Sequence, residues 1–210
     1  MAILRLSHVE IRVPDLELAT AYYSEVVGMF ETAREGDRVF LKCWDEHQHH
    51  SVILQSAPTY GLVRMGWKLQ FLEDLDYYQA KLQEAGVFVN RLTPEQVGPG
   101  GGYSIRFNLP SGHEMELTHG MDQVGNLLPL TNPPPKPLGM VGIAPPRIDH
   151  IFLTCEDVGE NTEFLERVLD FHMTEQVLGD DGFQIAAWLE HSNQSHDIAL
   201  VTGQDRGLHH

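Results

Sequence analysis

The residues best suited to chemistry are the histidines in the last third of the chain. His150 lies in an apolar, strand-like run, Arg147–Leu153, His196 lies in a second such run, and His209 and His210 end the sequence. One histidine in an apolar run is more often a buried core residue than a ligand. Imidazole is nevertheless the commonest ligand for transition metals in proteins, so several such positions in one segment favour a metal site.

The segment that carries these histidines repeats an earlier part of the chain. His150 and Asp157 are separated by seven residues, and so are His8 and Asp15. The offset between corresponding residues of the two segments drifts only from 142 to 146 along the repeat. We infer that one ancestral unit is used more than once.

Each unit is predicted to fold as β-α-β-β-β. Residues 4–13 follow a strand pattern, and Asp15 is expected to cap a helix that stops at Gly28. Three short strand patterns separated by turn signals follow. The buried face of the helix is predicted from the i, i+3, i+4, i+7 spacing of four residues: Ala19, Tyr22, Tyr23 and Val26.

A shorter and more divergent copy is predicted within residues 64–120. Its helix is expected to be capped by Asp74, and residues 87–89 are expected to form its next strand. The glycine-rich run 98–102 lacks the Lys-Ser/Thr pair and following helix of a phosphate loop, so it is interpreted as a hairpin connection.

Two domains joined by a proline-rich linker are expected. Residues 121–146 hold seven of the twelve prolines, which do not fit a packed helix or a central strand. The predicted divisions are an N-terminal domain over 1–128 with modules at about 4–58 and 62–120, a linker over 129–146, and a partial C-terminal domain over 147–210 with a third module and the start of a fourth.

Charge and composition argue against several classes of protein. Fourteen basic and thirty acidic residues give a formal net charge of −16, which repels phosphate backbones and anionic membranes, so no nucleic-acid or membrane partner is expected. No run approaches the roughly 18 apolar residues of a membrane span, and no secretion signal pattern is present, so a cytoplasmic location is expected. Cys43 and Cys155 lie in apolar runs and are expected to be reduced, buried thiols.

The chain resembles the type I extradiol ring-cleavage dioxygenases of the vicinal oxygen chelate superfamily, and looks most like the catechol 2,3-dioxygenases. The matching segments are residues 149–152, 176–182, 195–200 and 207–210. The resemblance implies an α+β fold in which β-α-β-β-β modules form two cup-shaped mixed sheets. Only the C-terminal cup would bind metal, and the fourth module of the family would be missing here.

The resemblance also implies roles for individual residues. His150 and His210 would be metal ligands, and His196 would be an acid–base residue that does not bind the metal. Trp188 and Phe152 would line the substrate pocket, with plain core packing as the alternative for both. The implied metal is Fe(II), with Mn(II) possible for the same ligands. The family's third ligand, a glutamate of the fourth module, is absent, so we expect the chain to be a fragment of a longer protein.

The N-terminal copies serve as an internal comparison. By the same alignment, the ligand positions become His8, Gly66 and Glu116. Glycine has no side-chain ligand atom, so the N-terminal cup is expected to be structural and metal-free. A nearby histidine cluster is expected on the solvated surface: His47, His49 and His50.

The function implied by the resemblance is extradiol cleavage of catechol or a substituted catechol by dioxygen, in aromatic catabolism. The products would be of the 2-hydroxymuconic semialdehyde type, and a homo-oligomer is expected. Two alternatives stay open at this point. One is a glyoxalase-type metal-dependent isomerase or transferase built on the same modules, and the other is a module that binds an aromatic compound without catalysis or metal.

Overall fold

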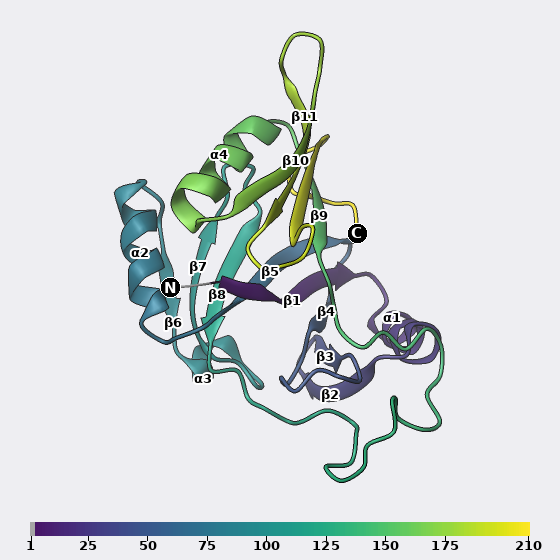
Figure 1. Cartoon of the computed structure of the whole chain (residues 1–210). Coiled ribbons are helices and arrows are strands. Elements are labelled where there is room, and N and C mark those ends of the chain that lie inside the picture. The colour runs from purple at the N-terminus through teal and green to yellow at the C-terminus, as the bar shows by residue number, and fades with distance from the viewer. Residues whose placement is uncertain (1–2) are drawn as a thin grey trace.

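The computed structural model describes residues 3–210, which form two mixed β-sheets (Figure 1). The first sheet has eight strands in the order β2-β3-β4-β1-β5-β8-β7-β6, and the second has five in the order β10-β11-β12-β9-β13. The predicted α+β fold of repeated modules is confirmed.

The first sheet consists of two units joined at its centre, where β1 pairs antiparallel with β5. In each unit the first strand also pairs in parallel with the last strand, β1 with β4 and β5 with β8. The elements of the first unit are β1 (Ile3–Val13), α1 (Leu16–Ala21), the π-helical turn η1 (Tyr22–Val27), β2 (Phe30–Glu35), β3 (Arg38–Lys42) and β4 (Val52–Ser56). Those of the second are β5 (Gly61–Leu69), α2 (Asp74–Glu84), β6 (Asn90–Leu92), α3 (Pro94–Val97), β7 (Tyr103–Asn108) and β8 (Glu114–His119).

The second sheet repeats the arrangement found around β1. Its strand β9 pairs in parallel with β12 and antiparallel with the short strand β13. In the same way, β1 pairs in parallel with β4 and antiparallel with β5. The hairpin of β10 and β11 projects beyond the rest of the molecule (Figure 1). The elements are β9 (Ile151–Cys155), α4 (Val158–Leu169), β10 (His172–Leu178), β11 (Gln184–Glu190), β12 (Ile198–Thr202) and β13 (Gly207–Leu208).

The first helix begins as predicted but changes its pitch. The side chain of Asp15 accepts a hydrogen bond of 2.9 Å from the backbone N–H of Leu18, which confirms the predicted N-cap. The helix then passes into η1 and ends at Gly28, whose φ of 85° suits glycine. Because a π-helical turn is wider than an α-helical turn, the 3.6-residue periodicity no longer holds. The predicted buried face is therefore wrong for Tyr22 and Val26, which are 53% and 49% exposed.

The second unit departs from the prediction at two places. Asp74 is the first residue of α2 and not its cap, and its buried carboxylate accepts a hydrogen bond of 3.0 Å from the N–H of Phe71. Residues 87–89 form no strand, because the chain after α2 first pairs with β7 where Asn90 lies opposite Arg106.

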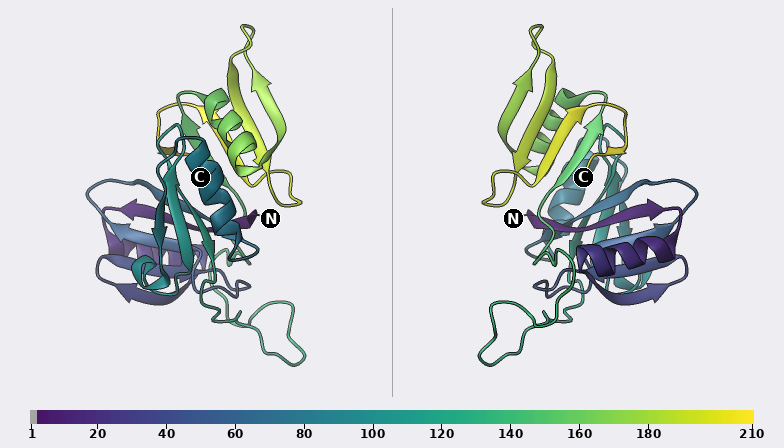
Figure 2. Two further views of the ribbon diagram at one scale, coloured as in Figure 1. Left: turned by 90° about the vertical axis from the view of Figure 1, so that its left-hand side faces the viewer. Right: turned by 90° about the vertical axis from the view of Figure 1, so that its right-hand side faces the viewer.

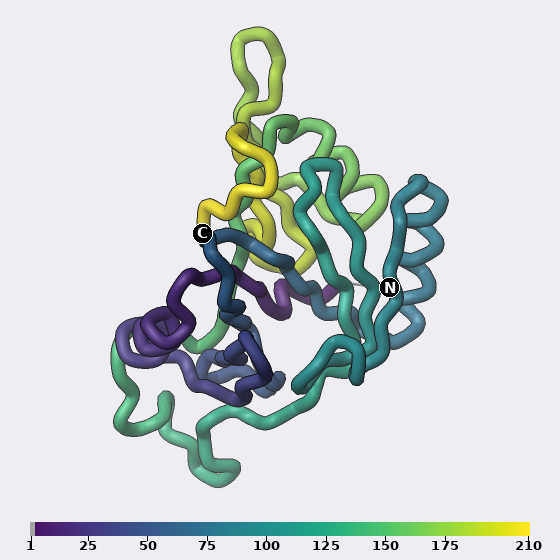
Figure 3. The backbone as a smooth tube through the Cα atoms, turned by 180° about the vertical axis from the view of Figure 1, so that it is seen from behind, coloured from purple at the N-terminus to yellow at the C-terminus, as the bar shows by residue number. Residues whose placement is uncertain are grey.

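One apolar core extends across both sheets. Trp67 of β5 and Phe171, which follows α4, meet edge to face with ring centroids 5.1 Å apart. The helices α2 and α4 lie side by side on the outside of this core (Figure 3), where Lys81 forms an ion pair with Asp170 at 2.5 Å. Both cysteines are buried and free, as predicted.

Between β8 and β9 the chain forms no helix or strand, and part of it loops away from the body of the molecule (Figure 2). Backbone hydrogen bonds hold part of this segment to η1, from Ile143 to Val26 at 3.0 Å and from Ala144 to Val27 at 2.8 Å. The exact division into domains and linker stays a prediction. Among residues 3–210, no helix has both the length and the apolar character needed to cross a membrane.

Candidate metal centre

The pairing of β9 with β13 brings two distant histidines together. The N–H of His209 donates to the carbonyl of Phe152 at 2.9 Å, and the N–H of Phe152 donates to the carbonyl of His210 at 2.8 Å. These bonds place the Nε2 atoms of His150 and His210 3.2 Å apart. Two imidazole nitrogens that bind one ion, each at about 2.1 Å, lie within about 4.2 Å of each other. The two side chains therefore fit a shared metal ion.

Asp149 orients the first of these imidazoles. Its Oδ2 atom lies 3.0 Å from Nδ1 of His150. A carboxylate accepts hydrogen bonds, so Nδ1 carries the proton and Nε2 keeps its lone pair for a ligand. Asp149 was not among the predicted site residues, although it directly precedes His150 in the motif.

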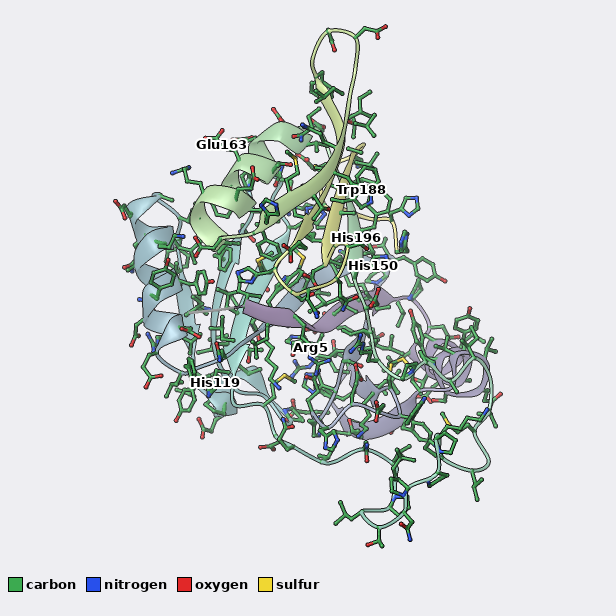
Figure 4. The ribbon with its side chains drawn as sticks, viewed as in Figure 1. Arg5, His119, His150, Glu163, Trp188 and His196 are labelled. Carbon is green, nitrogen blue, oxygen red and sulfur yellow. The ribbon has the colours of Figure 1, made fainter. Side chains whose placement is uncertain are left out.

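His196 lies directly beside His150. The ring centroids of the two imidazoles are 4.6 Å apart and their planes are inclined by 62° (Figure 4). Oγ of Ser195 is 3.2 Å from Nδ1 of His196. The Nε2 atom of His196 is therefore left to contact another group. Burial, and then the charge of a protonated His150, lower the pKa of His196, which favours its neutral form. Burial likewise lowers the pKa of His210, and the neutral form of imidazole is the one that binds metal.

The loop before His196 is held by a residue that sequence reasoning missed. Asp197 is fully buried, and its Oδ2 accepts hydrogen bonds from the N–H groups of His191 at 2.7 Å and Ser192 at 2.8 Å. Its carbonyl also accepts a bond from the N–H of Ile151, the first residue of β9. The strands that follow His150 and His196, β9 and β12, are thereby fixed relative to each other.

The predicted pocket aromatics share one face of this sheet. Trp188 lies opposite Ala199, which in turn lies opposite Phe152, so all three point to the same side. The ring of Phe152 contacts His209 and His210, with centroids 4.7 and 5.3 Å away. Figure 4 shows Trp188 on the same sheet as His196 and His150. The other face of β9 carries Ile151 and Leu153, which are buried in the core.

In the first sheet, the positions that correspond to the metal ligands leave no space for a metal ion. His8 lies opposite Gly66, and a Cβ atom on Gly66 would be only 2.0 Å from the His8 ring, so that ring occupies the space of a second ligand. The carboxylate of Glu116 is held by hydrogen bonds from Ser104 and Arg106, at 2.9 and 2.5 Å.

Burial and nearby positive charge keep His8 neutral. Complete burial, followed by the charges of Arg64 and Arg106, lowers the pKa of His8 to about 3. The nearest carboxylate oxygen, on Glu116, is 3.9 Å from its Nε2 atom. Its Nδ1 atom has no hydrogen-bond partner among the described residues.

The predicted surface position of the N-terminal histidine cluster is wrong for His50. This residue is only 2% exposed, and its ring lies edge to face against His8 and Phe40, with centroids 5.4 and 5.1 Å away. It corresponds to His196, because it lies two residues before β4 as His196 lies two residues before β12. Of the three, His47 is exposed and His49 is half-buried.

Within residues 3–210, no group of three or more histidine, cysteine, aspartate or glutamate side chains has the arrangement needed to hold a metal ion. His150 and His210 thus present a two-nitrogen site. A separate hollow of about 890 Å³ lies between α1 and residues 204–208, and none of His150, His196 and His210 lines it.

Comparison with known proteins identifies the family. Residues 64–119 match the model of the catechol 2,3-dioxygenase-like N-terminal domain, and residues 147–210 match that of the Glyoxalase/Bleomycin resistance protein/Dioxygenase superfamily. The chain is 32% identical to metapyrocatechase of Pseudomonas sp. (strain CF600), across 99% of this chain and 68% of that protein. It is 28% identical to manganese-dependent 2,3-dihydroxybiphenyl 1,2-dioxygenase of Geobacillus genomosp. 3, across 99% of this chain and 67% of that one.

A solved structure gives the same result. The 2,3-dioxygenase LapB from Pseudomonas sp. KL28 superposes on the whole of this chain and 74% of its own, with a TM-score of 0.94 and 35% sequence identity. The chain therefore belongs to the type I extradiol ring-cleaving dioxygenases of the vicinal oxygen chelate superfamily, as the resemblance predicted. It spans about two thirds of the length of the two curated relatives.

Proposed function

We propose that this chain serves the cleavage of catechol or a substituted catechol by dioxygen, beside the diol, with a non-haem Fe(II) ion. The observation that carries the proposal is the 3.2 Å separation of the Nε2 atoms of His150 and His210. The names of two relatives, metapyrocatechase and 2,3-dihydroxybiphenyl 1,2-dioxygenase, support ring dioxygenation of an aromatic diol. The expected products are of the 2-hydroxymuconic semialdehyde type.

The donor set suits Fe(II), and Mn(II) is the alternative because one relative is named as manganese-dependent. Both imidazoles present Nε2, and Asp149 fixes the tautomer of His150. When bound, such an ion supplies open coordination positions for the two catechol oxygens and for dioxygen. The glutamate that the family resemblance implies as third ligand stays a prediction.

His196 is proposed to move protons during the reaction. Its lowered pKa leaves it neutral near pH 7, so its free nitrogen can accept a proton from a catechol hydroxyl and later return it to a departing oxygen. Ser195 holds Nδ1 and so directs the other nitrogen away from the loop.

Phe152 and Trp188 are proposed to bind the apolar part of the substrate. They project from the same face of the sheet as the histidines, and their rings offer flat apolar surface to a catechol ring. Assembly of the protein into a homo-oligomer stays a prediction.

The proposal is tested by adding Fe(II) without oxygen, and then catechol and air, while dioxygen uptake and the yellow ring-cleaved product are recorded. His150→Ala and His210→Ala should each weaken metal binding by about 100-fold or more and abolish both signals. His196→Phe should retain the metal but slow turnover by about 100- to 10,000-fold, the range of general acid–base catalysis.

His172→Ala is the matched control, because His172 is an exposed histidine of β10 in the same half of the chain. It should leave metal binding and turnover unchanged. Near-normal turnover in His196→Phe would disprove the proton-transfer role. Metal binding that persists in both ligand variants would disprove the site itself.

A further inference from the structure

The first sheet makes a direct contact with the strand that leads to His210. His113 lies in the tight turn between β7 and β8 and is only 2% exposed. Its Nε2 atom is 3.1 Å from the carbonyl oxygen of Gly207 in β13. A carbonyl oxygen can only accept, so Nε2 carries the proton and Nδ1 accepts a hydrogen bond from the hydroxyl of Ser111, 2.8 Å away. Burial lowers the pKa of His113, which favours this neutral form.

The same turn is also fixed to the helix of the second sheet. The N–H of Ser111 donates to Oδ1 of Asn161 at 3.2 Å, and the side-chain amide of Asn161 donates to the carbonyl of Asp157 at 2.8 Å. Asn161 belongs to α4, so one turn of the first sheet contacts both α4 and β13. This turn therefore cannot shift without moving a backbone contact of β13.

The strand β13 is short, and its position decides where His210 lies. Gly207 pairs with Thr154 of β9, and a Cβ atom on Gly207 would be 1.8 Å from the Thr154 hydroxyl, so this pairing requires glycine. His210 is three residues further along, about 10 Å in an extended strand. A shift of β13 by one residue would turn its side chains to the opposite face of the sheet.

We infer that His113 is a positioning residue for the metal centre: its hydrogen bond to Gly207 fixes β13 against β9 and so places the His210 imidazole opposite His150. The expected effect of His113 on metal affinity rests on the proposed function. The inference assigns the first sheet a role in shaping the site of the second sheet. His113 touches neither metal ligand and acts only through the backbone of β13.

The test compares two substitutions at position 113. His113→Phe keeps a ring but loses the donor, whereas His113→Gln keeps a side-chain N–H that can reach the Gly207 carbonyl. Two quantities are measured: amide hydrogen exchange of residues 207–210 without metal, and the Kd for Mn(II) by calorimetry. His113→Phe should speed exchange at His209 and raise the Kd by about 10-fold or more, because the His210 imidazole would no longer be held opposite His150. His113→Gln should restore both to within about threefold of the unsubstituted chain.

Leu82→Ala is the control for a general loss of stability. Leu82 is fully buried in α2, and its removal leaves a cavity in the first half of the molecule without a change to the contacts of β13. It should lower the Tm at least as much as His113→Phe and leave the Kd unchanged.

The outcomes separate the inference from the proposed function. Unchanged exchange at His209 in His113→Phe would overturn the inference, whatever the metal does. Faster exchange with an unchanged Kd would also overturn it, because β13 would then not need His113 to place the ligand. If His113→Phe speeds exchange but His210→Ala binds Mn(II) as tightly as the unsubstituted chain, the positioning of β13 stands and the proposed metal function fails.

Discussion

His8 and His150 occupy corresponding positions in the two sheets but have different surroundings. His8 is completely buried beside two arginines, and a glycine opposite it leaves room for its ring. His150 is only half-buried, has Asp149 at Nδ1, and faces a second imidazole. A fully buried imidazole whose Nδ1 atom has no hydrogen-bond partner among the described residues, such as that of His8, fits a structural role. An accessible ring nitrogen with a free lone pair next to a second imidazole nitrogen, as in His150, fits a metal ligand.

The low pKa of His8 predicts loss of stability in acid. Above pH 6.5 His8 is neutral in the folded and the unfolded chain and contributes no pH dependence. Between pH 6.5 and about 3 the unfolded chain binds a proton that the folded chain does not, so the free energy of unfolding falls as the pH falls. The loss from His8 alone should reach about 2 kcal/mol at pH 5.

Denaturant unfolding at pH 7 and pH 5 measures this effect. His8→Leu removes the titrating group at similar volume and should reduce the difference between the two pH values by about that amount. His172→Leu, an exposed histidine, is the control and should not reduce it. An equal pH dependence in His8→Leu and the unsubstituted chain would show that His8 titrates normally.

Among the elements, the third unit places two of its histidines just before two of its strands. His150 directly precedes β9, and His196 lies two residues before β12. The strands pair in parallel, so their starts lie at the same edge of the sheet and the two imidazoles meet. The helix α4 lies across the opposite face and buries Phe164, Leu165 and Val168 against the core.

The start of α4 offers a test of how firmly this helix is held. The side chain of Asp157 accepts a hydrogen bond of 2.8 Å from the N–H of Glu160. Asp157→Ala should lower the free energy of unfolding by about 1 kcal/mol, the usual cost of losing an N-cap, as measured by denaturant unfolding. Glu163→Ala, at an exposed position of the same helix, should change it by less than about 0.5 kcal/mol. Equal effects of the two substitutions would mean that the cap does not stabilise the helix.

In the molecule as a whole, the first sheet and the candidate metal site of the second sheet form one structure. The core that contains Trp67 and Phe171 runs through both sheets, and His113 connects the first sheet to β13. A change at His113 can therefore reach β13 directly, without an intervening hinge.

The sequence predicted the units because their strand patterns and the seven-residue spacing of His8 to Asp15 recur at His150. Local pattern could not predict the π-helical turn or the burial of His50, since both depend on packing between elements. The contact of His113 with Gly207 joins residues 94 positions apart, so no local signal marks it. Asp149 had a signal, its place next to His150, but only the geometry shows what its carboxylate binds.

The most direct test of the account is the position of a bound metal in crystals grown with Mn(II), located by anomalous scattering. We expect one ion per chain, within coordination distance of Nε2 of both His150 and His210, and none beside His8, where the ring fills the space opposite Gly66. An ion bound at His8 or His50, or an ion that contacts only one of His150 and His210, would contradict the account.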